Sequence, residues 1–312
     1  MKKWYLILSV LLLSLLLAAC GGDTEAESDG AEEKEEKVTI EHELGETEVT
    51  KKPENVVVFD FGTVDSLDEL GVEIQGVAKD SLPTYLSQYE GDEYENIGSL
   101  KEPDFESISQ MDPDVIFISG RQSEVYDELS EIAPTIHLGV DTTRYMDSFK
   151  ENMKTLGEIF EKEDEVESEL ADIQSDIEGV NEKSESMEGE GLITLANDGK
   201  VSAYGEGSRF GLIHDVFGVP AADESIESST HGQSISFEYI SEQNPDYLFV
   251  VDRGAVVGGE SSAEQVVENE IVQNTTAYKE DQIIYLDPEY WYLSGGGLQS
   301  VAAMVAEIEE SL

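Results

Sequence analysis

The sequence is poor in cysteine and histidine. Its 312 residues include one cysteine, Cys20, and four histidines, His42, His137, His214 and His231. A single thiol excludes an internal disulfide framework, a zinc site built from paired cysteines and an iron–sulfur cluster. The histidines are scattered and form no HExxH motif, so a histidine-based zinc or manganese site is also a poor interpretation.

Basic residues are scarce as well. Lys and Arg total 18 against 70 Asp and Glu, which gives a formal net charge of -52. A surface of this charge repels nucleic-acid phosphates and anionic lipid headgroups, so we expect no nucleic-acid partner and no membrane binding through basic residues. At roughly 150 residues per domain, the length leaves room for two domains or one large one.

The common catalytic motifs are missing. There is no GxSxG segment to present a serine nucleophile, and no motif pairs a serine or Cys20 with a histidine base. The first expected strand is followed by Phe61-Gly62-Thr63-Val64-Asp65, which lacks the glycines of both the GxGxxG and the Walker phosphate-binding loops. We therefore expect that the protein is not an enzyme.

The N-terminus has the pattern of an export signal. Lys2 and Lys3 precede an apolar run from Trp4 to Leu17, which is too short for a comfortable membrane span. We expect residues 1–19 to be a signal peptide, with an uncleaved anchor helix as the alternative. Leu17-Ala18-Ala19-Cys20 resembles the lipobox of bacterial lipoproteins. This resemblance implies that Cys20 is lipid-modified and tethers the chain to the outer face of the cytoplasmic membrane.

An acidic segment follows the lipobox. Residues 23–37 contain no large apolar side chain, so they cannot bury enough surface to offset the entropy that is lost on ordering. We expect residues 20–50 to be the lipidated cysteine and a flexible stalk, and the folded domain to begin at about Lys51.

Two segments of the sequence repeat each other in one register. Phe105-Glu106-Ser107-Ile108-Ser109 and Phe237-Glu238-Tyr239-Ile240-Ser241 are each followed by Pro-Asp, an apolar run and an arginine, at Arg121 and Arg253. The recurrence of this many residue types at one spacing indicates two lobes of similar build.

Continuous apolar runs predict strands that are buried on both faces. They lie at Val56–Phe61, Val115–Ile118, Thr135–Leu138, Leu192–Ala196, Tyr247–Val251 and Ile283–Leu286. Helical patterns follow several of them, which predicts α/β lobes with parallel sheets in both halves. A striped helix from about Glu163 to Ser184 predicts a rigid connector. We assign residues 51–145 to a first lobe, 146–189 to the connector and 190–312 to a second lobe.

Two α/β lobes joined by one helix, exported and lipid-anchored, resemble the substrate-binding proteins of iron–siderophore and cobalamin ABC importers. The resemblance extends from about Lys51 to Leu312 and is carried by the lipobox, the repeated motif and the connecting helix. It implies a class III periplasmic-binding-protein fold, with two Rossmann-like lobes and a ligand cleft between them. It also implies a monomer without an intrinsic cofactor that delivers its ligand to an ABC permease and its ATPase.

Several segments resemble more narrowly the petrobactin-binding lipoproteins of Gram-positive bacteria, among them IGSLKEPDFESI, SRFGLIHDVFGV and WYLSGGGLQS. This resemblance implies that the ligand is iron(III) carried by petrobactin or by another catecholate or citrate siderophore. A haem or cobalamin receptor of the same fold is an alternative that stays open. From another functional class, an exported lipid-anchored hydrolase is the competing interpretation.

Three of the four arginines occupy positions suited to an anionic ligand. Arg121 and Arg253 each follow an apolar strand, at the edge where open parallel sheets bind ligands. Arg209 follows a glycine-rich turn and opens an expected helix, where negative charge is favoured. We predict that these arginines bind the siderophore, because a planar guanidinium donates several hydrogen bonds to delocalised anionic oxygens. The alternative is that they pair with some of the 70 carboxylates.

Four aromatic residues and one histidine are further candidates for contact with the ligand. Trp291 and Tyr292 precede a run of glycines, and either could stack on a catecholate ring. Phe61, Tyr204 and His231 are expected in comparable loops. We interpret His231 as a hydrogen-bond donor and not as a ligand of iron, because a siderophore fills the coordination shell of the metal itself. Packing in the core or in the cleft wall is the alternative for each of these residues.

Glu106 and Glu238 are the matched acidic pair of the repeat. A glutamate on a short surface helix is usually only solvated. The resemblance, however, implies that one exposed glutamate in each lobe docks onto arginines of the permease. Charges of this kind set orientation and association rate more than affinity.

Overall fold

The computed structural model describes residues 36–312. The predicted signal peptide, the predicted lipidation site Cys20 and most of the predicted stalk lie outside these residues. Within the described range, no helix has the length and apolar character needed to span a membrane.

The described part of the chain begins with an antiparallel hairpin. Its strands, β1 (Lys37–His42) and β2 (Gly45–Thr50), bury Ile40 and Val49. The hairpin is joined to the first lobe by a hydrogen bond of 2.8 Å from the Thr47 hydroxyl to the carbonyl of Thr135. The prediction of a flexible stalk up to residue 50 is therefore wrong for residues 37–50, because this segment does find a surface on which to bury its apolar side chains.

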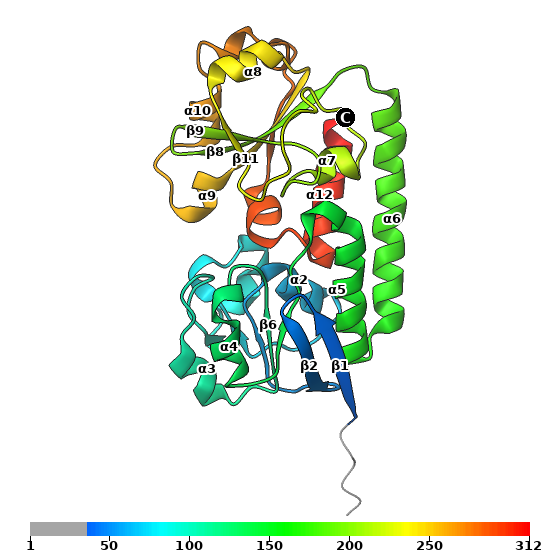
Figure 1. Ribbon diagram of the computed structural model, residues 1–312, viewed down its shortest axis with the longest axis vertical. Coiled ribbons are helices and arrows are strands. Elements are labelled where there is room, and N and C mark those ends of the chain that lie inside the picture. The colour runs from blue at the N-terminus through cyan, green and yellow to red at the C-terminus, as the bar shows by residue number, and fades with distance from the viewer. Residues whose placement is uncertain (1–35) are drawn as a thin grey trace, which may run out of the picture. The chain divides into compact units, whose positions relative to one another are not determined.

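The first lobe is built on a five-stranded parallel sheet with the strand order β5-β4-β3-β6-β7. Its strands are β3 (Val56–Val58), β4 (Gly76–Val77), β5 (Glu95–Asn96), β6 (Val115–Ile118) and β7 (Thr135–His137). Its helices are α2 (Phe61–Glu69), α3 (Phe105–Met111) and α4 (Tyr126–Ser130) (Figure 1). The strand expected from Val56 to Phe61 ends early, because the Asp60 side chain accepts a hydrogen bond from Thr63 N and caps α2.

The second lobe has a five-stranded mixed sheet with the order β10-β9-β8-β11-β12. Its strands are β8 (Gly191–Asn197), β9 (Lys200–Tyr204), β10 (Gln233–Ile235), β11 (Tyr247–Asp252) and β12 (Ile283–Leu286). Its helices are α7 (Leu212–Asp215), α8 (Phe237–Gln243), α9 (Arg253–Val257), α10 (Ala263–Val267) and α11 (Thr276–Lys279).

The prediction of parallel sheets is confirmed for the first lobe and wrong for part of the second. Strands β8, β11 and β12 are parallel, whereas β9 is antiparallel to β8 and β10 is antiparallel to β9. The reason is the turn between β8 and β9, where Asp198 and Gly199 both have positive φ, 46° and 80°. An Asp-Gly pair in this conformation closes a two-residue hairpin, which can join only antiparallel strands.

The internal repeat corresponds to one helix–strand unit in each lobe. Helix α3 leads into β6 and helix α8 leads into β11, and each helix buries its isoleucine, Ile108 or Ile240. The aspartate of each Pro-Asp pair is structural. Asp114 accepts a hydrogen bond from Asn55 N beside the first sheet, and Asp246 accepts one from Glu190 N beside the second. The two copies of the repeat therefore form the same helix–strand unit, one in each lobe, with the same aspartate hydrogen bond and the same buried isoleucine.

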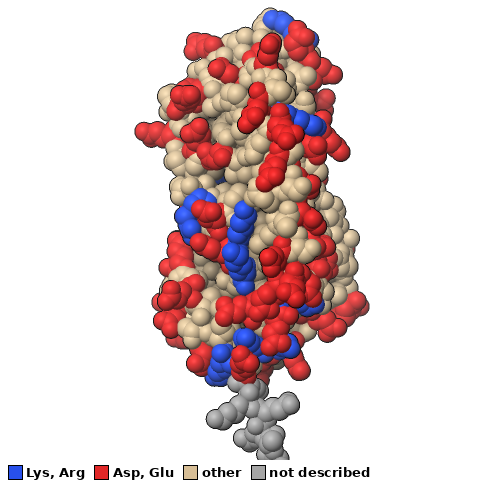
Figure 2. Space-filling view, turned by 90° about the vertical axis from the view of Figure 1, so that its right-hand side faces the viewer, with Lys and Arg blue, Asp and Glu red and all other residues tan. Residues whose placement is uncertain are grey.

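The connector consists of two helices, α5 (Tyr145–Phe160) and α6 (Glu163–Ser186). The predicted stripe along α6 is buried, from Val166 through Ile173 to Val180. Figure 1 shows α6 running along one side of both lobes. Figure 2 shows acidic side chains over both lobes on the face that carries α6, with basic side chains in only a few places.

The last segment of the chain returns to the first lobe. It contains a π-helical turn, η6 (Glu289–Ser294), and the C-terminal helix α12 (Leu298–Ser311). Helix α12 packs against α6 and against α2 (Figure 1). Gly62 on α2 allows this approach, because a Cβ there would lie 2.9 Å from the backbone nitrogen of Gly297. This segment falls in the range that the sequence analysis assigned to the second lobe, yet its packing partners include the first lobe.

Candidate functional site

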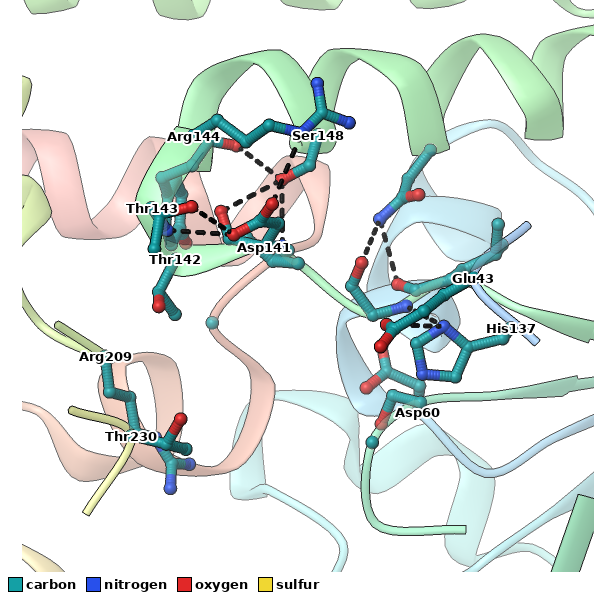
Figure 3. Close-up of a pocket in the computed structure, with 18 of the residues that line it drawn as sticks. Glu43, Asp60, His137, Asp141, Thr142, Thr143, Arg144, Ser148, Arg209 and Thr230 are labelled. Atoms are coloured by element: carbon teal, nitrogen blue, oxygen red, sulfur yellow. Dashed lines mark hydrogen bonds and ion pairs between the residues drawn. The ribbon is translucent and has the colours of Figure 1, made fainter. Parts of the chain in front are cut away.

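A cavity of about 1370 Å³ in the described part of the chain has walls from both lobes. The first lobe contributes residues at the carboxyl ends of its parallel strands, the position at which open α/β sheets bind ligands, and the start of α5. The second lobe contributes Arg209 and residues 228–231, and η6 supplies Trp291 and Tyr292. In Figure 3, Arg209 and Thr230 lie on one side of the cavity, while Asp60 and His137 lie on another.

A smaller cavity of about 370 Å³ shares part of the wall. Arg121 and Tyr292 line both cavities, whereas Arg209 lines only the larger one and Arg253 only the smaller one. The three arginines predicted to bind the ligand therefore line two cavities that share Arg121 and Tyr292. We call these two cavities together the cleft.

The three arginines converge on Tyr292. Its carbonyl oxygen accepts hydrogen bonds from Arg121 Nη2 at 2.9 Å and from Arg209 Nη2 at 2.6 Å. Its hydroxyl accepts a hydrogen bond of 2.8 Å from Arg253 Nε. The Arg209 guanidinium also lies over the Tyr292 ring, 4.2 Å from its centroid, as in a cation–π contact. Arginines from both lobes thus share one neutral acceptor residue.

The positive charge of this cluster is not compensated by carboxylates. Among residues 36–312, Arg144 forms ion pairs with Asp141 and Glu151, but Arg121, Arg209 and Arg253 form none. The interpretation that these three arginines simply pair with acidic side chains is therefore wrong within the described residues. Burial and the neighbouring charge of Arg121 lower the pKa of Arg209. A chain with 70 acidic residues leaves three guanidinium groups available to an anion.

The cluster also favours negative charge on a phenolic oxygen. Burial alone would raise the pKa of Tyr292, but the hydrogen bond from Arg253 and the charges of the three arginines outweigh it and lower the pKa. The lowered pKa of Tyr292 shows that the arginine cluster stabilises negative charge on an oxygen attached to an aromatic ring. An ionised catecholate oxygen placed there would be stabilised in the same way.

The remaining predicted residues divide into two groups. His231 is exposed and Trp291 is buried, and both line the larger cavity. The indole nitrogen of Trp291 donates to Glu307 Oε2 at 2.7 Å, so this residue offers the cavity its ring and not its N–H group. Phe61 and Tyr204 are buried, at 0% and 3% exposure, and line neither cavity. Their prediction as ligand contacts is wrong, because Phe61 starts α2 and Tyr204 ends β9, where it packs against Phe210.

Sequence reasoning missed several groups in the cleft. Asp60 and His137 line the larger cavity, and each stands at the carboxyl end of a strand, which is the signal that singled out the arginines. Burial lowers the pKa of His137, partly offset by Glu43 and Asp60. The acceptor carbonyl of Tyr292 had no such signal, because a backbone group is the same in every residue.

Side chains of the first lobe hold η6 and α12 in place. Asp65 on α2 accepts hydrogen bonds from Ser300 N at 3.2 Å and from the Tyr85 hydroxyl at 2.9 Å. The Tyr85 oxygen also accepts a hydrogen bond of 2.6 Å from the Ser294 hydroxyl, and Ser66 Oγ accepts from Leu298 N at 3.0 Å. These bonds fix the segment that carries Tyr292 to the first lobe.

Asp65 should make the stability of the chain depend on pH. Burial raises its pKa to about 7, although hydrogen bonds from Ser300 and Tyr85 act in the opposite direction. Because the folded-state pKa lies above the ordinary value of 3.8, the contribution of Asp65 to stability is complete below about pH 4 and is lost as the pH rises to about 7. We expect the melting temperature of Asp65→Asn to fall less between about pH 5 and pH 8 than that of the unchanged chain.

Thermal unfolding at the two pH values checks this expectation. Glu167→Gln, on the exposed face of α6, is the matched control, since it removes one carboxylate without touching Asp65. The control should keep the pH dependence of the unchanged chain. An equal fall in Asp65→Asn and in the control would contradict the role of Asp65.

The two glutamates of the repeat lie on the surface, at the starts of α3 and α8. Glu106 and Glu238 are both exposed, so they are free to meet a partner protein. Among the described residues, no group of three His, Cys, Asp or Glu side chains is arranged to hold a metal ion.

The chain is similar to known proteins over most of its length. The family model described as Periplasmic binding protein matches residues 56–290. Petrobactin-binding protein YclQ of Bacillus subtilis (strain 168) is 52% identical over 316 residues, which cover 100% of this chain and 99% of that protein. The crystal structure of YclQ has a TM-score of 0.87 and 54% identity, with coverage of 88% of this chain and 98% of that chain. The periplasmic catecholate-siderophore binding protein VctP of Vibrio cholerae has a TM-score of 0.83 and 38% identity, with coverage of 88% and 100%.

Proposed function

Because the chain belongs to the periplasmic binding protein family, we propose that it captures an iron(III)-siderophore outside the cell for an ABC importer. The observation that carries this proposal is the cluster of Arg121, Arg209 and Arg253, which lines the cleft without carboxylate partners in the described chain. Within residues 36–312, their hydrogen-bond donors meet only Tyr292, Leu293 and Asn197. An anionic ferric chelate would supply the missing negative charge.

Petrobactin is the siderophore that we propose. The relative at 52% identity is named as a petrobactin-binding protein, and VctP is named as a catecholate-siderophore binding protein. Catecholate oxygens carry delocalised negative charge on an aromatic ring, which suits guanidinium groups and the neighbouring rings of Tyr292 and Trp291. Hydrogen bonds to charged groups contribute about 1.5–3 kcal/mol each, so three arginines can support tight binding after the entropy of association is subtracted.

The net charge of the chain does not prevent binding of an anion. At physiological salt the Debye length is about 8 Å, so carboxylates on distant surfaces are largely screened. The arginines that touch the ligand are not screened in this way. The arginines in the cleft should therefore determine whether an anion binds, and the net charge of the chain should matter little.

Delivery of the ligand requires a membrane anchor and a permease. The lipobox-like Leu17-Ala18-Ala19-Cys20 supports a tether to the outer face of the cytoplasmic membrane, with the chain acting as a monomer. Glu106 and Glu238, exposed at equivalent positions of the two lobes, are the residues that we propose dock onto the permease, which works with its ATPase. We propose that the protein itself carries out no catalysis and holds no intrinsic cofactor.

Titration with ferric petrobactin tests the proposed function. Binding should quench tryptophan fluorescence, since Trp291 lies in the cavity wall, and should give a submicromolar Kd. Haem and cobalamin, the alternatives of the same fold, should bind at least about tenfold more weakly, because neither presents ionised catecholate oxygens to the arginines. Haem or cobalamin binding that equals or exceeds ferric petrobactin binding would replace the proposed ligand by that compound.

A further inference from the structure

The hydroxyl of Tyr145 is buried in the wall of the larger cavity without a hydrogen-bond partner. Tyr145 is the first residue of α5, is 6% exposed and lines the cavity. Among the residues that the structure describes, the buried side-chain oxygens without a partner are those of Tyr145 and Ser184. Ser184 lies on α6 and lines neither cavity, so Tyr145 is the one that concerns the cleft.

A hydroxyl in this state does not help the chain to fold. A buried polar group without a partner costs stability, and phenylalanine would fill the same space without that cost. Other buried tyrosines in the first lobe are satisfied. The Tyr85 hydroxyl donates to Asp65 and accepts from the Ser294 hydroxyl, and the Tyr89 hydroxyl donates to Asp68 at 3.0 Å. The stability of the fold therefore does not explain why this position has a tyrosine and not a phenylalanine.

The surroundings of this hydroxyl indicate which chemical group would satisfy it. Its pKa is raised by burial and by the charges of Asp65 and Asp60, and the charge of Arg209 acts in the opposite direction. Asp60 and Arg209 line the same cavity as Tyr145. Among the contacts of the described chain, the Arg209 guanidinium donates only from Nη2, so further N–H groups are available. A phenolic O–H and a guanidinium are both donors, so each suits an anionic oxygen of a ligand in this cavity.

We propose that Tyr145 is a ligand-binding residue, whose hydroxyl donates a hydrogen bond to an anionic oxygen of the ferric chelate in the larger cavity. The inference rests on the proposed function and adds to it a residue outside the arginine cluster. Donation to the ligand therefore requires that this hydroxyl, which is covered in the structure, becomes accessible on binding.

Two tyrosine-to-phenylalanine substitutions test this inference, with ferric petrobactin as the probe. Tyr145→Phe should weaken binding about tenfold and leave the melting temperature unchanged or higher, since it removes an unsatisfied hydroxyl. Tyr89→Phe is the matched control, because its hydroxyl is buried and bonded to Asp68 and the residue lines neither cavity. The control should lower the melting temperature by about 2–4 °C and leave the affinity unchanged.

The outcomes separate the inference from the proposed function. Failure of the unchanged chain to bind ferric petrobactin would overturn the proposed function, and this inference with it. Normal binding by the unchanged chain with equal affinity in Tyr145→Phe would overturn this inference alone. A loss of thermal stability in Tyr145→Phe as large as that in Tyr89→Phe would also overturn it, since the hydroxyl would then have a structural partner.

Discussion

Arg209→Ala should weaken the binding of ferric petrobactin by about 10- to 150-fold, the loss expected for one or more hydrogen bonds to a charged group. The same substitution should not destabilise the ligand-free chain. Arg209 is partly buried, its pKa is lowered by burial, and no carboxylate of the described chain compensates its charge. Removal of an uncompensated charge relieves a desolvation cost, which offsets the lost bond to the Tyr292 carbonyl.

The effect should depend on the planar shape of the side chain and on its charge. Arg209→Lys keeps the charge but loses the forked donors and the stacking over Tyr292, so it should recover only part of the affinity. Lys162→Ala is the control, because its charge is already compensated by Glu165 and the residue lines neither cavity. Fluorescence titration gives the affinities and thermal unfolding gives the stability. An Arg209→Ala affinity equal to that of the control would remove Arg209 from the site.

The double substitution Glu106→Arg, Glu238→Arg should reduce cellular uptake of iron-petrobactin at least about tenfold, while binding to the isolated protein stays unchanged. Both residues are exposed and line neither cavity, so they can act on delivery without acting on capture. Reversal of both charges would replace the proposed attraction to permease arginines by repulsion, and like charges across an interface disfavour a complex by several kcal/mol.

A control with the same change in net charge isolates the position of these glutamates. Glu167→Arg, Asp176→Arg reverses two exposed acidic side chains on α6, away from the paired helices α3 and α8. Uptake of radioactive iron by cells that carry each variant is the measurement. If both double variants transport iron like the unchanged protein, the docking role of Glu106 and Glu238 is wrong.

Much of the site could be predicted from the sequence, because its arginines directly follow strands that the sequence also predicts. Arg121 and Arg253 follow equivalent strands of the repeat, and carboxyl ends of parallel strands meet at one edge of a sheet. The same local logic failed for Phe61 and Tyr204. A residue next to a strand can start a helix, as Phe61 does, or turn its ring into the core, as Tyr204 does.

Other parts of the site depend on contacts between distant segments. Arg121 is hydrogen-bonded to the carbonyl of Tyr292, 171 residues along the chain, and a carbonyl has no signature in the sequence. The return of α12 to the first lobe depends on Asp65, Ser66 and the close approach at Gly62. The glycine run before α12 can be read from the sequence, but the surface of α2 that it approaches cannot. The Asp-Gly turn between β8 and β9 was a readable signal for an antiparallel pair.

Anomalous scattering from a crystal of the complex with ferric petrobactin would locate the iron and so show whether the three arginines hold the chelate. We expect an iron peak in the cleft between the lobes, with the guanidinium groups of Arg121, Arg209 and Arg253 bonded to siderophore oxygens. An iron peak outside the cleft, or a bound chelate that leaves all three arginines on Tyr292, would contradict this expectation.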